Sequence, residues 1–237
     1  MNNTNNNKIN ISIIIVAAGT GSRMQSSEHK QFLQLGGKPL LEITLRAFED
    51  HPMVWEIILV SHTTEINRVR KEIIEPGEFK KVKKVISGGD TRTDSVKAGL
   101  RNVSRKATHV AVHDGARPLI TKTMLDRVFA QALSSGAAIL ATRITDTVKE
   151  TDEKGKVIAT VPRNKLWAAQ TPQVFAREWI EAAYKSLSQD ASVTDDAAVL
   201  EAAGYSVYTV ECSKDNMKIT VPSDLLQAEM ILKGRRQ

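Results

Sequence analysis

A small-residue loop followed by two cations is the first segment of this sequence whose residue types suit chemistry. It reads Ala17-Ala18-Gly19-Thr20-Gly21-Ser22-Arg23-Met24, it follows a β-branched run, and Lys30 comes soon after it. Small residues let a backbone approach phosphate groups closely and donate its N–H groups to them. Arg23 and Lys30 would add positive charge beside that loop. The pattern favours a polyphosphate site, with an ordinary strand-to-loop turn as the alternative.

Two common phosphate-binding loops do not match this segment. A Rossmann dinucleotide fingerprint needs a third glycine where Met24 stands. A P-loop needs Gly-Lys-Ser/Thr, which the segment lacks. The missing glycine, together with Arg23 and Lys30, also counts against a nucleotide-binding regulatory or redox protein. We therefore expect a polyphosphate whose charge is met by side chains that follow the loop.

A second candidate segment joins a predicted strand to a predicted helix. It reads Gly88-Gly89-Asp90-Thr91-Arg92-Thr93-Asp94-Ser95. Glycine at a tight turn permits a positive φ and a close approach to a ligand. Asp90 or Ser95 could hydrogen-bond the edge of a base, or could cap the following helix. From the chemistry of these residues alone we favour capping.

The third candidate segment is His113-Asp114-Gly115-Ala116-Arg117-Pro118, at the end of a predicted buried strand. Ligands of doubly wound sheets bind outside the carboxyl ends of the strands. Mg²⁺ prefers oxygen ligands and is commonly held by one or two carboxylates together with phosphates. Asp114 is therefore the best metal-ligand candidate, with a loop aspartate that caps a turn as the alternative. We expect His113, on the buried strand, to pack rather than to act as a base.

The elements that must position these segments alternate between short apolar runs and helical patterns. Such alternation predicts a mostly parallel sheet with helices on both faces, an α/β fold with a three-layer, Rossmann-like arrangement. Strands are predicted at 9–16, 54–60, 82–86, 108–113, 137–141, 205–210 and 217–220. Helices are predicted at 39–50, 64–74, 93–103, 121–135 with Thr121 as N-cap, 176–188, 194–202 and from Pro222 onward.

Residues 143–165 break this rhythm and predict a protruding β-hairpin arm with a polar turn. Two strands alone are only marginally stable in water, so the hairpin should lean on its own domain or on a second subunit. Residues 1–8 form a polar, Asn-rich tail that we expect to be disordered. We expect a single domain over 9–237 with a dimerisation arm at about 143–165. Two small domains are the alternative.

Composition excludes several classes of protein. The chain has 237 residues, of which 41% are hydrophobic and 25% charged, so it is not wholly disordered. A single cysteine, Cys212, excludes a disulfide framework within one chain. No apolar run is long enough to cross a bilayer, and the first residues lack the apolar core of a signal peptide, so we expect a cytoplasmic protein with no membrane partner.

The formal net charge of +6 suggests anionic partners. A nucleic-acid binder would be one interpretation of that charge. Aromatic residues make up only 5% of the chain and form no base-stacking cluster, so we expect no nucleic-acid partner.

Later motifs complete a pattern with the three segments above. They are Asp146-Thr147-Val148-Lys149, Arg163-Asn164-Lys165-Leu166-Trp167-Ala168-Ala169-Gln170-Thr171-Pro172-Gln173, Thr194-Asp195-Asp196 and Asp215-Asn216-Met217-Lys218-Ile219-Thr220. In this order over residues 9–233, the set resembles the 2-C-methyl-D-erythritol 4-phosphate cytidylyltransferases, a family of the sugar-phosphate nucleotidyltransferases. The family pattern usually has proline before the lysine of the glycine loop, where this sequence has His29.

The resemblance implies a reaction of non-mevalonate isoprenoid biosynthesis. CTP and 2-C-methyl-D-erythritol 4-phosphate (methylerythritol phosphate below) would give the CDP-alcohol and pyrophosphate, with Mg²⁺ as cofactor. The implied catalytic residues are Arg23, Lys30 and Lys218. The implied CTP-binding residues are Ala17, Ala18, Gly19, Gly21, Gly89, Asp90 and Ser95, which reverses the preference for capping. The implied substrate-binding residues are Asp114 (also the metal ligand), Gly115, Arg117, Thr147, Arg163 and Thr194.

The resemblance also implies a homodimer. Thr147 and Arg163 match positions on an arm that is exchanged between subunits and reaches the active site of the partner. A cytidylyltransferase for another polyol phosphate, such as ribitol 5-phosphate, is the nearest alternative, since only the acceptor pocket would differ. The residues at 163–173 favour methylerythritol phosphate.

Overall fold

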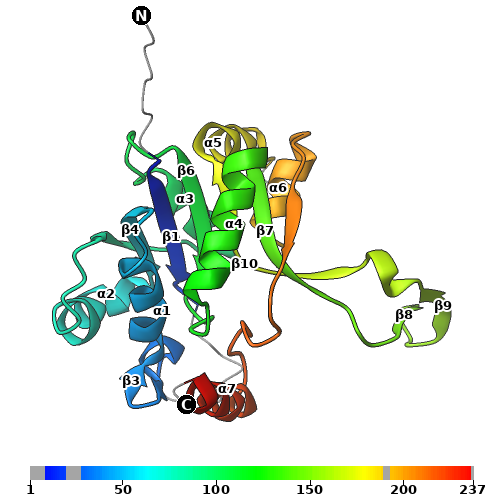
Figure 1. The fold of residues 1–237 in the computed structure, drawn as a ribbon, viewed down its shortest axis with the longest axis horizontal. Coiled ribbons are helices and arrows are strands. Elements are labelled where there is room, and N and C mark those ends of the chain that lie inside the picture. The colour runs from blue at the N-terminus through cyan, green and yellow to red at the C-terminus, as the bar shows by residue number, and fades with distance from the viewer. Residues whose placement is uncertain (1–8, 20–27, 189–192, 236–237) are drawn as a thin grey trace, which may run out of the picture.

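The structure, a computed structural model, describes residues 9–19, 28–188 and 193–235. Its centre is a seven-stranded sheet with the order β11-β7-β10-β6-β1-β4-β5 (Figure 1). The strands are β1 (Ile11–Ala17), β4 (Val54–Ser61), β5 (Val82–Ser87), β6 (His109–Asp114), β7 (Ala137–Arg143), β10 (Trp167–Ala176) and β11 (Tyr208–Glu211). Every neighbouring pair is parallel except the two that β10 makes. The predicted mostly parallel α/β fold is confirmed.

Helices cover both faces of the sheet. On one face lie α1 (Leu40–Glu49), α2 (Ile66–Val69) and α4 (Lys122–Ser135), and on the other lie α3 (Arg92–Leu100), α5 (Arg177–Ser186) and α6 (Asp196–Ala202). Along β1, Ile13 and Ile15 pack in the first of these layers and Ile14 in the second. Both faces of β1 are therefore buried, which is why its sequence is continuously apolar rather than alternating.

Strand β10 is absent from the sequence-based prediction, and Pro172 explains why. Proline cannot donate to a sheet ladder, so it normally argues against a central strand. Here the pairing register between β10 and β7 shifts between Ala169 and Gln173, around the proline. The irregularity lets a central strand contain Pro172.

Three other predicted elements need correction. The strand predicted at 217–220 is wrong, because Ile219 donates its N–H to the carbonyl of Ala116 at 2.9 Å and no strand forms there. The helix predicted at 194–202 begins at Asp196, and its N-cap is Asp195, which accepts from the Ala198 N–H at 3.0 Å. The helix predicted at 64–74 is a 3₁₀ turn, α2 and a π-helical turn in succession.

Two predictions for helix starts can also be checked. Thr121 is the N-cap of α4, as predicted, and accepts from the Met124 N–H at 3.3 Å. Pro39, predicted as the first helical residue, is instead the N-cap of α1. The predicted disordered tail at 1–8 lies outside the described residues.

The predicted hairpin is present as β8 (Val148–Thr151) and β9 (Val157–Val161). Its turn is closed by Asp152, whose carboxylate accepts from the N–H groups of Lys154 and Lys156, each at 2.9 Å. Figure 1 shows this arm extending away from the sheet. Val157 and Ile158 on β9 are more than half exposed.

A small two-stranded ribbon and the last helix pack against each other beside the central sheet. The ribbon is β2 (Gln34–Leu35) with β3 (Lys38–Pro39), and the helix is α7 (Pro222–Arg235). Gly36 and Gly37 join the two strands with φ of 61° and 83°, a conformation that favours glycine in tight hairpins. Leu35, Ile219 and Ala228 form one buried cluster there. In the described part of the chain, no helix is both long enough and apolar enough to cross a membrane.

Candidate active site

A cavity of about 540 Å³ opens where the carboxyl ends of β1, β4, β5 and β6 meet. The chain leaves β1 for β4 on one side and later returns to β6 on the other, so the strand order reverses here. Such a reversal is where open α/β sheets bind ligands. The cavity is lined by Val16, Ala17, Ala18, Gly19, Lys30, Gln31, Leu40, His62, Gly89, Asp90, Thr91, Arg92, Ser95, Asp114, Gly115, Ala116, Lys218 and Thr220.

The fold brings most of the predicted site residues together around this cavity. Those that line it are Ala17, Ala18, Gly19, Lys30, Gly89, Asp90, Ser95, Asp114, Gly115 and Lys218. The others that the structure describes, Arg117, Thr147, Arg163 and Thr194, are not part of its lining. Gly21 and Arg23 lie outside the described residues. The three sequence segments therefore converge as expected, while the arm residues and Thr194 stand apart.

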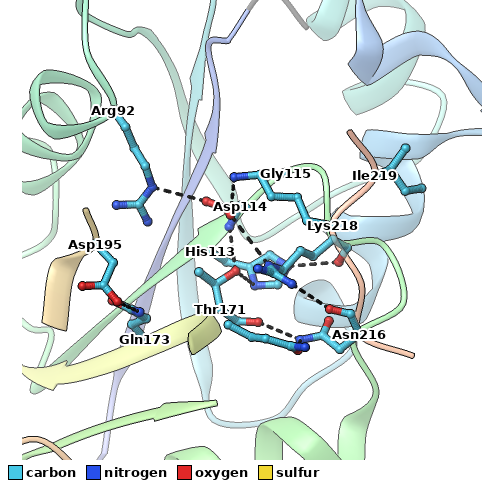
Figure 2. Close-up of polar contacts among 12 residues, drawn as sticks. Arg92, His113, Asp114, Gly115, Thr171, Gln173, Asp195, Asn216, Lys218 and Ile219 are labelled. Atoms are coloured by element: carbon cyan, nitrogen blue, oxygen red, sulfur yellow. Dashed lines mark hydrogen bonds and ion pairs between the residues drawn. The ribbon is translucent and has the colours of Figure 1, made fainter. Parts of the chain in front are cut away.

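Asp114 is surrounded by positive charge. Its Oδ2 lies 2.8 Å from the Nζ of Lys218 and 3.7 Å from the Nε of Arg117, and its Oδ1 lies 3.4 Å from the Nε of Arg92 (Figure 2). Burial opposes ionisation of Asp114, but Lys218, Arg92 and Arg117 outweigh it and lower the pKa of Asp114 below its ordinary value. The carboxylate is therefore charged throughout the physiological pH range.

Lys30 also lines the cavity. It begins the 3₁₀ turn η2 (Lys30–Phe32), and its Nζ donates to the carbonyl of Ile219 at 3.0 Å. Because Ile219 directly follows Lys218, that contact brings the two lysines to one wall of the cavity. Two cations so placed suit a ligand with several negative charges.

The segment between β5 and α3 corrects the capping interpretation. The N-cap of α3 is Thr91, whose side chain accepts from the Asp94 N–H at 3.0 Å while Asp94 accepts from the Thr91 N–H. Neither Asp90 nor Ser95 caps the helix. Asp90 lines the cavity, and the Oγ of Ser95 accepts from the Gly89 N–H at 3.2 Å. The capping prediction is wrong because Thr91 and Asp94 already form a reciprocal capping box.

His113 packs as predicted. It is fully buried against the ring of Phe48, with ring centroids 4.9 Å apart. Burial lowers the pKa of His113 to about 4, so the ring is neutral at pH 7. Its Nε2 lies 3.1 Å from the carbonyl of Arg117, which can only accept, so Nδ1 accepts from the Thr171 hydroxyl at 3.1 Å. The hydroxyl in turn accepts from the Asp114 N–H at 3.0 Å. His113 therefore supports the backbone between Asp114 and Arg117 and does not line the cavity.

The donor chemistry of the cavity fits Mg²⁺. Asp90 and Asp114 are the carboxylates in its lining. Among the described residues, no group of three or more His, Cys, Asp or Glu side chains could hold a metal ion. One ionised carboxylate beside a phosphate site is nevertheless the usual arrangement for Mg²⁺, since substrate phosphates and water supply the other ligands. An ion that enters with a nucleotide is therefore compatible with Asp114.

Comparisons with known proteins identify the family of this chain. The family model of 2-C-methyl-D-erythritol 4-phosphate cytidylyltransferase matches residues 11–234. The chain belongs to this family. A 2-C-methyl-D-erythritol 4-phosphate cytidylyltransferase of Alkaliphilus oremlandii is 44% identical over 227 residues, covering 95% of this chain and 96% of the relative. The chain is thus a nucleotidyltransferase, as its sequence motifs indicated.

Solved structures of cytidylyltransferases share the fold over nearly the whole chain. The 4-diphosphocytidyl-2C-methyl-D-erythritol synthase of Anaerococcus prevotii superposes with a TM-score of 0.82 and 32% identity, over 96% of this chain and 99% of that one. The 2-C-methyl-D-erythritol 4-phosphate cytidylyltransferase of Francisella tularensis gives a TM-score of 0.78 and 33% identity, over 93% and 99%. Both structures are named for the methylerythritol reaction, and neither is named for ribitol 5-phosphate.

Gly88 does not line the cavity but packs against two residues that do, and the sequence analysis did not single it out. A methyl group there would lie 2.4 Å from the Cβ of Ala18 and 2.7 Å from the Oγ of Ser95, so only glycine lets these cavity residues approach each other. The signal was the pair of glycines after a strand. We expect Gly88→Ala to lower the free energy of unfolding by about 1–3 kcal/mol, because overpacking displaces the neighbours. It should also raise the KM for CTP, since Ala18 and Ser95 line the cavity.

Thermal melting and steady-state kinetics check this prediction. Gly234→Ala is the matched control, because a methyl group at Gly234 has nothing within 4 Å and its φ is not positive. The control should melt and react like the wild type. A Gly88→Ala protein with unchanged melting and unchanged KM would contradict the close approach of the two segments.

Proposed function

We propose that this chain transfers the cytidylyl group of CTP to methylerythritol phosphate and releases pyrophosphate. The observation that carries the proposal is the ionised Asp114, which lies with Lys218 and Arg92 at the cavity beside the glycine loop. Membership of the cytidylyltransferase family identifies the nucleotide and the acceptor. Lys30, Arg92 and Lys218 supply positive charge to the lining of the cavity, which suits anionic substrates.

A phosphate monoester oxygen of the acceptor would attack the α-phosphorus of CTP, in line with the bond to the departing pyrophosphate. A phosphate monoester has a second pKa of about 6, so it is mostly dianionic at pH 7 and needs no general base. His113 does not offer such a base, because its ring is buried and both ring nitrogens are already hydrogen-bonded. The barrier is then the repulsion between anions, which fixed positive charge reduces.

Roles for the individual residues follow from that chemistry and from the family resemblance. Lys30 and Lys218 would stabilise the charge that develops on the phosphates, and the family resemblance gives Arg23 the same role. Mg²⁺ at Asp114, when bound, would place further positive charge on phosphate oxygens. Cytidine would be bound by Ala17, Ala18, Gly19, Gly21, Gly89, Asp90 and Ser95, and the acceptor by Asp114, Gly115, Arg117 and Thr194.

We also propose that the active species is a homodimer of single-domain chains spanning residues 9–237. Thr147 and Arg163 are exposed and flank the two strands of the hairpin, outside the lining of the cavity. The arm at about 143–165 extends away from the body of its own chain, and exposes Val157 and Ile158 (Figure 1). A second copy of the chain would both cover those apolar side chains and receive Thr147 and Arg163 at its cavity.

Pyrophosphate release from CTP tests the proposed reaction. With Mg²⁺ present, the purified protein should release pyrophosphate when methylerythritol phosphate is supplied, and far less when ribitol 5-phosphate replaces it. CTP without an acceptor is the control for hydrolysis. Release with neither acceptor above that control would contradict the proposed function, and equal release with both would contradict the assigned acceptor.

A further inference from the structure

A buried carboxylate that the mechanism above does not use lies behind the cavity. Asp196 is the first residue of α6, and its side chain is fully buried. Its Oδ2 accepts from the Nη2 of Arg92 at 2.7 Å, and its Oδ1 accepts from the hydroxyl of Tyr184 on α5. A buried charge is costly unless it is paired and hydrogen-bonded. Asp196 is therefore committed to Arg92 and Tyr184.

The position of Asp196 is itself fixed to the sheet. Gln173 of β10 donates through Nε2 to the Oδ2 of Asp195 at 2.8 Å and accepts from the Ala197 N–H at 2.9 Å (Figure 2). Asp195 also caps α6. The residues on either side of Asp196 are thus held by one side chain of a central strand. The carboxylate has little freedom to follow a movement of Arg92.

Arg92 joins this buried anchor to the cavity. While its Nη2 contacts Asp196, its Nε lies 3.4 Å from the Oδ1 of Asp114. A planar guanidinium can contact two carboxylates at once, whereas the compact ammonium of lysine cannot reproduce that geometry. Lys218 and Arg117 both approach the other oxygen of Asp114. Arg92 therefore balances them from the opposite side of the carboxylate.

We propose that Arg92 is a positioning residue of the transfer reaction. It holds the Asp114 carboxylate in one orientation, and the buried pair of Asp196 and Tyr184 holds Arg92. Without Arg92, the carboxylate would turn toward Lys218 and Arg117 and draw those cations out of place. The inference rests on the proposed function, which wild-type pyrophosphate release in the same assay tests separately.

The first test is Arg92→Lys, which keeps the charge but not the bridge. We expect kcat to fall about 10- to 100-fold, as when a reacting group is misplaced by about 1 Å. The KM for CTP should stay close to the wild-type value, while the melting temperature should fall, because lysine does not replace the full pairing of the buried Asp196. The matched control is Arg177→Lys, since Arg177 pairs with Glu181 and is not part of the cavity lining. The control should keep wild-type kinetics, and a wild-type kcat for Arg92→Lys would overturn the proposal.

A double-mutant cycle tests whether Arg92 acts through Asp114. In an Asp114→Asn background, Arg92→Lys should lower kcat by no more than about 2-fold, because the group it positions has already been lost. Tyr184→Phe removes only one hydroxyl and should lower kcat less than Arg92→Lys does. In the Asp114→Asn background its effect on kcat should also largely disappear. Additive losses would mean that Arg92 acts independently of Asp114, and would overturn the proposal.

A crystal structure of Arg92→Lys gives a readout that does not depend on activity. The Asp114 carboxylate should be rotated toward Lys218 relative to the wild type. An unchanged carboxylate in a variant with lowered kcat would overturn the positioning role.

Discussion

Replacing Lys30 with alanine is expected to lower kcat by about 10²- to 10³-fold, the usual effect of removing one fixed group that stabilises transition-state charge. The KM for CTP should change much less. Lys30 faces the cavity from η2 and is held by its bond to the Ile219 carbonyl, at 3.0 Å. A cation that is already in place needs no reorganisation when charge develops on the phosphates. Initial rates at saturating CTP and acceptor measure the loss.

The matched control for Lys30→Ala is Lys122→Ala. Lys122 is an exposed lysine of α4 that pairs with Asp126 at 2.7 Å, and it is not part of the cavity lining. Such a surface pair contributes little to stability, so this variant should keep wild-type turnover and melting. A Lys30→Ala protein that folds normally and turns over like the wild type would remove Lys30 from the catalytic set.

The sheet was predictable wherever one local pattern determines an element. The apolar run of β1 is long and buried on both faces, so its sequence alone predicts a central strand. Strand β10 has no such pattern, because Pro172 interrupts it and its pairing shifts in register at that point. Residues 217–220 show the opposite failure. They have strand-like side chains, but their backbone bonds to the Ala116 loop instead of to a strand.

The cavity was predictable to a similar degree. The glycine loop, the turn after β5 and Asp114 all follow parallel strands, so the fold had to bring them to one edge. The bridge of Arg92 could not be predicted in this way. Arg92 and Asp196 are 104 residues apart. Asp196 stands at the start of α6, where an acidic residue already suits the helix dipole, so nothing in the sequence marks it as the partner of Arg92. Only the packing of α5 and α6 against the sheet brings them together.

A mixture of two impaired variants is expected to recover activity, if the arm of one chain serves the cavity of another. Lys30→Ala damages the cavity and leaves the arm intact, while Arg163→Ala damages the arm and leaves the cavity intact. After subunit exchange between equal amounts, half of the dimers would be mixed. One of the two sites in each would have an intact cavity and an intact arm, so activity should return to about a quarter of the wild-type value.

The assay should use a methylerythritol phosphate concentration that saturates the wild type but not Arg163→Ala. We expect Arg163→Ala to weaken acceptor binding, because an arginine can hold a phosphate by two parallel hydrogen bonds. Among the described residues, the Arg163 guanidinium hydrogen-bonds to its own arm, through Nη1 to the Thr145 carbonyl. A loss of acceptor affinity without any effect on folding would show that Arg163 acts on the acceptor, and the mixing experiment then shows in which subunit it does so.

Lys30→Ala mixed with Lys218→Ala is the decisive control, because both changes lie in the cavity. Both cavities of every mixed dimer are then damaged, so no activity should return. Sedimentation of the mixtures establishes that dimers are present, and co-purification through an affinity tag on one of the two variants establishes that subunits exchange. Recovery in the first mixture alone requires two chains to build each site. If mixed dimers form and no activity returns, Arg163 acts within its own chain or outside the reaction. The proposal that the arm is exchanged between subunits would then be wrong.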